Sequence, residues 1–171
     1  AGDLAAVGLG AADHPLLGAA VGVAAEDEWI FTGRISLERQ PWIADHAVLE
    51  TVLLPSTAFV ELALHAGGET GCDTLEELTL EAPLVLPERG ALRLQVALGE
   101  SDELGRREVQ IHARRDDGKG DEDGWTRHAS GFLAPTEGGP APGTTQTSLQ
   151  ANGSGSSAGI PASRSIVAAR R

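Results

Sequence analysis

The sequence lacks the residues that several classes of protein require. A single cysteine, Cys72, excludes an intrachain disulfide and any metal site built from clustered thiolates. No run of residues approaches the roughly 18 uninterrupted apolar residues of a membrane span, and the first residues carry no basic region typical of a secretion signal. We therefore expect a cytoplasmic protein that makes no contact with a membrane.

Positive charge and aromatic side chains are also scarce. Lys and Arg total 13 against 25 Asp and Glu, which gives a formal net charge of −12, and aromatic residues make up 4% of the chain. A protein of this charge repels the phosphate backbone of nucleic acids. We therefore do not expect nucleic acid as a partner, and we expect Trp29, Trp42 and Trp125 to serve packing rather than base stacking.

Composition divides the chain near Pro135. Residues 136–171 contain no aromatic residue and are rich in Gly, Ser, Thr and Pro, so they cannot build a hydrophobic core. We expect residues 1–135 to form one folded domain and residues 136–171 to be a low-complexity, disordered tail. The tail carries three arginines and one glutamate, a net charge of +2, which leaves −14 for the domain.

Apolar periodicity predicts one short helix among several strands. Apolar residues spaced i, i+3, i+4 and i+7 from Phe59 to Ala66 predict the helix. Ser56 or Thr57 would cap its first amides, and Gly67–Gly68 would end it after about three turns. Alternating apolar and polar residues predict strands over 29–37, 75–80, 92–98, 109–113 and 125–133, the last weakened by Gly131. The acidic stretch 116–124 predicts a hairpin loop.

One short helix and several long antiparallel strands indicate an α+β fold. The helix can bury its apolar face only by lying across the sheet. An antiparallel sheet wrapped around one central helix is a hotdog fold, although composition and periodicity are also typical of other α+β sheets.

His46 is the residue best suited to chemistry. It lies in PWIADHAVLETVLLP, residues 41–55, among apolar neighbours. Burial there would keep the imidazole neutral and able to accept a proton. Taken alone, a histidine on an apolar segment is more often a packed core residue than a catalytic base, so the surrounding motif has to decide between the two.

This segment resembles the active-site signature HxxxGxxxxP of the dehydratase domains of modular type I polyketide synthases. His46 and Pro55 stand at the two ends of the signature with the correct spacing. The resemblance also includes HPLLG at 14–18, WIFTGRISL at 29–37, LEELTLEAPLVLP at 75–87 and HASGFLAP at 128–135. It therefore covers nearly all of the expected folded domain.

The resemblance implies that the chain is the first half of a double hotdog and that it serves one reaction. The substrate of such domains is a β-hydroxyacyl thioester on the phosphopantetheine arm of an acyl carrier protein. His46 would remove the proton α to the thioester, and an aspartate of the second hotdog would protonate the departing hydroxyl. Amides at the amino end of the helix would stabilise the enolate-like oxygen. No bound cofactor or metal is implied, and the expected partners are the carrier protein and the other polyketide synthase domains.

Three departures from the family pattern bear on activity. Glu50 replaces the motif glycine, where a positive φ would make any side chain costly and where a carboxylate would lie near the enolate. Ser56 replaces the glycine that is common after the motif proline, a mild change. Residues after Pro135 resemble no second hotdog, and the ending ASRSIVAARR resembles a shifted reading frame or a truncated gene. We therefore expect an incomplete active site that is inactive, or nearly so, on its own.

Two other functions stay open. The chain could be a non-catalytic structural or interaction module, which Glu50 and the lack of the aspartate favour. It could also be a stand-alone single-hotdog hydratase or thioesterase that pairs two chains, although such enzymes carry base and acid on one hotdog. Half of a double hotdog would expose the surface that meets its partner, so we expect a homodimer or aggregation.

The remaining candidates have simpler interpretations. We expect His14 to be a turn residue, because no metal-ligand spacing accompanies it. Asp45 is expected to be exposed rather than to orient the neighbouring imidazole, and Cys72 to be an unactivated thiol. The side chains expected to face solvent are those of His65, His112 and His128.

Overall fold

The computed structural model describes residues 3–116, 124–136 and 167–169. Its strands are β1 (Gly10–His14), β2 (Leu17–Val23), β3 (Glu28–Ile35), β4 (Ala47–Val48), β5 (Thr51–Val52), β6 (Thr74–Leu80), β7 (Leu92–Ser101), β8 (Arg107–Arg115), β9 (Thr126–Ala134) and β10 (Val167–Ala169). Its helices are the 3₁₀ turns η1 (Ala5–Val7) and η2 (Pro41–Asp45) and the α-helix α1 (Ser56–Glu69). The strands expected from alternation are confirmed, with ends that differ by a few residues.

Eight strands form one sheet in the order β1-β2-β3-β7-β8-β9-β6-β10. Every neighbouring pair is antiparallel except β6 and β10, which run parallel. The short hairpin β4–β5 stands apart as a second, two-stranded sheet. Among the described residues, β1 and β10 therefore occupy the two edges of the main sheet.

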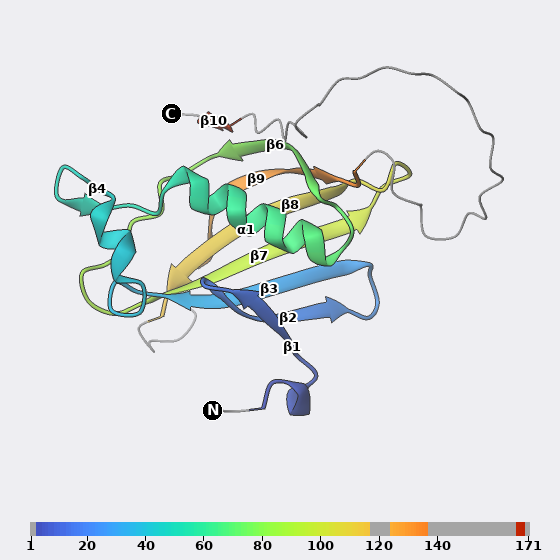
Figure 1. Ribbon diagram of the computed structural model, residues 1–171, viewed down its shortest axis with the longest axis horizontal. Helices are drawn as coiled ribbons and strands as arrows, with labels where there is room; N and C mark the ends of the chain where they lie inside the picture. The colour runs from blue at the N-terminus through green and yellow to red at the C-terminus, as the bar shows by residue number, and fades with distance from the viewer. Residues whose placement is uncertain (1–2, 117–123, 137–166, 170–171) are drawn as a thin grey trace, which may run out of the picture.

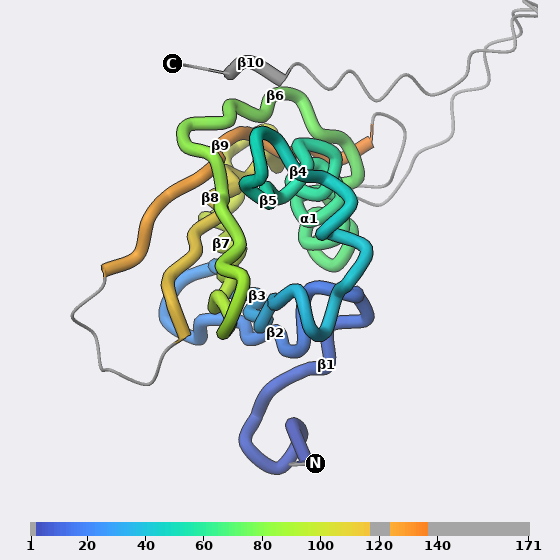
Figure 2. The backbone as a smooth tube through the Cα atoms, turned by 90° about the vertical axis from the view of Figure 1, so that its left-hand side faces the viewer, coloured from blue at the N-terminus to red at the C-terminus, as the bar shows by residue number. Residues whose placement is uncertain are grey.

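The sheet curves around α1, which lies across one face (Figures 1 and 2). The inward-facing residues of the central strands are fully buried against the helix, because alternate side chains of a strand point to one face. Fully buried core residues include Phe31, Ile35, Leu62, Leu75, Leu78, Leu94, Val96, Ile111 and Leu133. A curved antiparallel sheet around one buried helix confirms the expected hotdog fold.

The predicted ends of the helix are wrong at both termini. Pro55 occupies the N-cap position, and no side-chain hydrogen bond caps the first turn. The helix passes through Gly67–Gly68 and ends at Glu69, so its 14 residues make about four turns. A side chain at Gly67 would overlap the carbonyl oxygen of Cys72. This glycine therefore serves close packing inside the helix rather than its termination.

Gly131 also has a packing role. It lies within β9 opposite Leu78 of β6, and a Cβ atom there would overlap the carbonyl oxygen of Glu77. The register between these two strands also shifts between Leu75 and Glu77. Glycine thus allows β9 to continue where the sequence predicted a weak strand.

Three strands of the main sheet were not predicted. β1 and β2 are built largely from glycine and alanine, which give little alternation, and Pro15 and Leu16 form the turn between them. β10 lies within the expected tail and pairs with β6. The rest of that tail and most of the predicted acidic hairpin loop lie outside the described residues, although β8 and β9 do pair as a hairpin requires.

Candidate functional site

His46 is positioned by the short helix η2. Pro41 occupies the first helical turn, where its missing N–H costs nothing, and Ile43 is fully buried in the core. The His46 N–H donates to the carbonyl oxygen of Ile43 at 3.0 Å, which ends the turn. One buried isoleucine thus fixes the backbone that carries the imidazole.

The imidazole is oriented by the backbone of Leu53. The Leu53 N–H donates to the His46 carbonyl oxygen at 3.1 Å, and His46 Nδ1 lies 3.0 Å from the Leu53 carbonyl oxygen. A carbonyl oxygen only accepts hydrogen bonds, so Nδ1 is the donor in this contact, and the neutral form of this tautomer has its lone pair on Nε2. The arrangement leaves Nε2 as a base.

His46 is exposed in this chain, so the expected burial is wrong. Asp45 is exposed as well, as predicted. The apolar residues that flank His46 in sequence do not enclose it, because β4 and β5 project from the domain as a two-stranded hairpin (Figure 1). Exclusion of water from the imidazole would require a surface that the described chain does not supply.

A second strand segment anchors the base of this hairpin. The Leu54 N–H donates to Leu84 O and the Leu86 N–H donates to Val52 O, both at 2.9 Å. The side chains of Leu54, Leu84 and Leu86 are buried in the core. The carbonyl group of Leu53, which lies between the bonded residues Val52 and Leu54, is therefore held rigidly toward His46.

The amino end of α1 follows directly. Pro55 is the N-cap, and the Ala58 N–H donates to its carbonyl oxygen at 3.0 Å. The N–H groups at the start of a helix have no intrahelical partner and carry the positive end of the helix dipole. The free amides of Ser56 and Thr57 therefore follow closely on Leu53, whose carbonyl oxygen orients His46, and Ser56 lies three residues after Leu53. Their side chains are exposed.

Glu50 stands in a strained turn. Val48 pairs with Thr51, so Leu49 and Glu50 are the two central residues of the β4–β5 hairpin, with φ angles of 50° and 63°. Positive φ at both positions is the type I′ pattern, which favours Asn and Gly. The motif glycine of the family thus corresponds to a position that requires a left-handed backbone, as the sequence suggested.

The turn separates Glu50 from the base of the hairpin. Two pairs, Val48 with Thr51 and Ala47 with Val52, lie between the turn and the rung formed by His46 and Leu53. At about 3.4 Å per residue, the turn lies roughly 10 Å from that rung. The backbone therefore places Glu50 at the tip of the hairpin and not beside the imidazole.

Several apolar side chains near this hairpin are exposed. Leu49 is 94% exposed, Val48 50% and Trp42 48%. Val85, which bridges to Leu53 at the base of the hairpin, is 48% exposed. A monomeric protein rarely leaves such a group of large apolar residues in water, so this end of the domain has the character of a contact surface.

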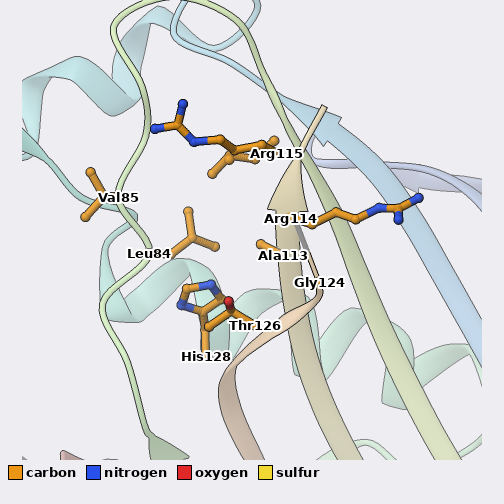
Figure 3. A pocket seen from close by; sticks show the side chains of 9 residues that line it. Leu84, Val85, Ala113, Arg114, Arg115, Gly124, Thr126 and His128 are labelled. Carbon is orange, nitrogen blue, oxygen red and sulfur yellow. The ribbon is translucent and has the colours of Figure 1, made fainter. Parts of the chain in front are cut away.

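A pocket of about 420 Å³ lies near the end of β8 and the start of β9 (Figure 3). Its lining residues are Leu84, Val85, Leu92, Ala113, Arg114, Arg115, Gly124, Thr126 and His128. His128 Nδ1 donates to the carbonyl oxygen of Ala82 at 3.1 Å, and only 8% of the residue is exposed. The prediction that His128 faces solvent is therefore wrong, because its ring ties β9 to the segment after β6.

The other two histidines expected to face solvent are half-buried. His65 Nε2 and His112 Nδ1 are buried, and neither atom has a hydrogen-bond partner among the described residues. Burial, followed by the charge of Arg127, lowers the pKa of His112. Alternation places His112 between the buried residues Ile111 and Ala113 of β8, but its ring is more covered than expected. His65 lies on α1, and its ring contacts the rings of His14 and Phe31.

His14 and Cys72 behave as expected. His14 ends β1 at the turn, and its Nδ1 accepts a hydrogen bond from the Leu16 N–H at 3.1 Å. Burial and the nearby ring of His65, whose centroid lies 5.0 Å away, lower the pKa of His14. Burial raises the pKa of the Cys72 thiol, which donates to the carbonyl oxygen of Gly105. An activated thiolate is thereby disfavoured.

The tryptophans pack or border the core. Trp29 packs against the core and stacks near Phe31. Trp125 lies at the surface under the guanidinium of Arg114, and Trp42 is half-exposed. Within the described part of the chain, no group of three or more His, Cys, Asp and Glu side chains is arranged to hold a metal ion. No helix among these residues is long and apolar enough to cross a membrane.

Sequence reasoning missed two features of the site, and only the first of them was beyond its reach. The orienting group of His46 is a backbone carbonyl, which no residue type reveals. The positive φ at Leu49 could have been found from the sequence. Two residues, Leu49 and Glu50, separate two β-forming segments, and the family motif has glycine at the second, which is typical of a type I′ turn.

Comparison with known proteins places this geometry in a family. Residues 14–114 match the family model described as polyketide synthase dehydratase domain. The chain is 60% identical over 134 residues, 78% of its length, to the pikromycin polyketide synthase component PikAII of Streptomyces venezuelae, of which the match covers 4%.

Solved structures agree in fold. The dehydratase domain from the terminal module of the rifamycin polyketide synthase superposes with a TM-score of 0.74 at 49% identity, over 81% of this chain and 48% of that chain. The erythromycin dehydratase gives a TM-score of 0.73 at 41% identity, over 86% of this chain and 53% of that chain. The chain therefore spans about half the length of the solved dehydratase domains that it matches, which agrees with the expected half of a double hotdog.

Proposed function

Because the chain belongs to the polyketide synthase dehydratase family and spans about half of such a domain, we propose that it supplies the half that carries the catalytic base. The reaction is elimination of water from a β-hydroxyacyl thioester held on an acyl carrier protein. The observation that carries the proposal is the contact between His46 Nδ1 and the Leu53 carbonyl oxygen, which leaves Nε2 free to accept a proton.

The proposed chemistry uses that geometry. His46 Nε2 takes the proton from the carbon α to the thioester, and the electron pair of the broken C–H bond forms the new C=C bond. The β carbon–oxygen bond breaks, and the hydroxyl leaves as water with a proton from an acid. The helix-start amides of Ser56 and Thr57 stabilise the negative charge that develops on the thioester oxygen.

The acid and a water-excluding cover come from a second hotdog in this proposal. The exposure of His46 and of the apolar residues around the hairpin supports it, because both call for a covering partner. The chain alone is then inactive or nearly so. It works in the cytoplasm, with the carrier protein and other synthase domains as partners and without a bound cofactor.

Complementation tests this proposal. The chain is mixed with the separately expressed second half of the rifamycin dehydratase domain, and association is first measured by sedimentation. A β-hydroxyacyl N-acetylcysteamine thioester is then added, and the ultraviolet absorbance of the enoyl thioester is followed. We expect turnover only in the mixture and its loss in His46→Ala. An associated mixture that shows no turnover, or equal turnover with His46→Ala, would contradict the proposal.

The non-catalytic alternative rests on Glu50, whose side chain is strained at a position suited to glycine. If Glu50 has disabled the site, the mixture is silent and Glu50→Gly restores turnover. If Glu50→Gly is also silent in an associated mixture, the chain is a structural or interaction module. Circular dichroism of each variant verifies that the fold is retained.

A further inference from the structure

A buried glutamine lies at the start of the short helix that carries His46. Gln40 is 7% exposed and is the N-cap residue of η2, and His46 is the C-cap residue at the other end. The Gln40 carbonyl oxygen accepts a hydrogen bond from the Ile43 N–H at 3.1 Å, and the Ile43 carbonyl oxygen accepts one from the His46 N–H at 3.0 Å. Two hydrogen bonds in series therefore connect the backbone of Gln40 to that of His46.

The side-chain amide of Gln40 is held at both of its polar ends. Gln40 Oε1 accepts a hydrogen bond from the Ser36 N–H at 3.0 Å, and Nε2 donates to the carbonyl oxygen of Pro15 at 3.4 Å. The Gln40 N–H also donates to the Ser36 carbonyl oxygen at 2.9 Å. A backbone N–H only donates and a carbonyl oxygen only accepts, so the amide has a single orientation that satisfies both partners.

The turn between β1 and β2, which contains Pro15, is packed closely against the sheet. Leu16 and Leu17 are each 3% exposed. A Cβ atom at Gly33 of β3 would overlap the carbonyl oxygen of Leu16, so the turn and β3 are in direct contact. The Gln40 amide joins this closely packed turn to the start of η2.

We infer, on the basis of the proposed function of His46, that Gln40 is a positioning residue for this imidazole. A 3₁₀ helix has poorer hydrogen-bond geometry than an α-helix, so the five residues of η2 do not fix their own position. Burial of Ile43 fixes the middle of η2, the Gln40 amide fixes its start, and the contact with the Leu53 carbonyl oxygen fixes its far end. Loss of the amide contacts frees the start of η2, and a displacement of about 1 Å at a catalytic group can cost about 100-fold in rate.

Nuclear magnetic resonance of the His46 ring tests this positioning without an activity assay. Gln40→Met keeps an unbranched side chain of similar size but removes both hydrogen bonds of the amide. The chemical shifts of the ring nitrogens are measured about two pH units above the usual histidine pKa, where the ring is neutral. We expect the proton on Nδ1 in the wild type and a mixture of the two tautomers in Gln40→Met.

Gln95→Met is the matched control. Gln95 lies on β7, and its side chain makes no hydrogen bond to another described residue. The same chemical change there should leave the His46 tautomer as it is in the wild type.

The complementation assay supplies the second measurement. With the second half of the rifamycin dehydratase domain present, we expect Gln40→Met to lower kcat by about tenfold or more with little change in KM. Gln95→Met should leave both constants unchanged. Circular dichroism verifies the fold of each variant. If Gln40→Met does not fold, Gln40→Glu takes its place, because a carboxylate keeps the acceptor for the Ser36 N–H and loses only the donor to Pro15.

An unchanged His46 tautomer in a folded Gln40 variant would overturn the inference, and so would a kcat equal to that of the wild type. Equal effects of Gln40→Met and Gln95→Met would also overturn it, because they would indicate a general loss of stability. Turnover that persists in His46→Ala would instead overturn the proposed function. The tautomer would still report in that case whether Gln40 orients the ring, since its measurement requires no turnover.

Discussion

Replacement of Glu50 by glycine should stabilise the domain, because the hairpin forces this residue into a left-handed backbone. Its φ is 63° and its side chain is exposed, so the substitution removes no buried contact. A left-handed conformation costs a residue with a Cβ about 1–2 kcal/mol. The greater flexibility of glycine in the unfolded chain takes back part of that gain.

The expected net stabilisation is about 1 kcal/mol, which for a chain of 171 residues corresponds to a rise in Tm of roughly 2–4 °C. Thermal unfolding followed by circular dichroism would measure it. Glu50→Ala is the matched control, because it removes the carboxylate but keeps the strained Cβ. Its Tm should stay close to that of the wild type.

Two results would refute this reasoning. If Glu50→Ala stabilises as much as Glu50→Gly, the gain comes from the loss of a negative charge in an acidic protein and not from the backbone. If Glu50→Gly leaves Tm unchanged, the left-handed turn does not persist in solution. Replacement of the neighbouring Leu49, with φ of 50°, by asparagine should add to the effect, since asparagine tolerates this region.

Three further predictions concern the rest of the domain. Gly131→Ala should lower stability by more than about 2 kcal/mol in chemical denaturation, because its Cβ would overlap Glu77 O, whereas Gly124→Ala, which meets open space, should be nearly neutral. The pKa of His14 is lowered by burial, so the unfolded chain binds more protons than the folded chain, and the stability of the fold should decrease as pH drops below about 6.5. His14→Asn keeps a hydrogen-bond acceptor and should weaken this dependence of Tm on pH. An unchanged dependence would exclude His14 as its source. Cys72 should react slowly with a disulfide reagent in the native state and rapidly after unfolding, since it is buried and its pKa is raised, and fast native reaction would contradict both.

The sequence predicted most of the architecture because the inward faces of the long strands follow period two. Leu94 and Val96 in β7 and Val109 and Ile111 in β8 are all fully buried, as alternation requires. The same method failed for β1 and β2, because glycine and alanine differ too little in hydrophobicity from their neighbours to show a period. It also misjudged Gly67, because the reason for a glycine there is the close approach of the Cys72 carbonyl oxygen from the segment after the helix.

The positions of the candidate residues along the fold agree with the sequence, but their exposure could not be predicted from it. The spacing from His46 to Pro55 located the imidazole and the start of the helix, and the structure joins them through Leu53. Exposure could not be read from the sequence, because apolar neighbours indicate burial only if something packs against them. The hairpin instead projects, and its apolar side chains remain in contact with water.

The departures from local rules are concentrated at this hairpin. Leu49 and Glu50 are the only non-glycine residues with positive φ in the described part of the chain, and Leu49 is also the most exposed large apolar side chain there. Strained backbone and exposed apolar side chains in one place lower the stability of the isolated domain, so they indicate a surface with a functional role. That surface also carries His46, so the proposed catalytic base and the exposed apolar side chains lie at the same end of the fold.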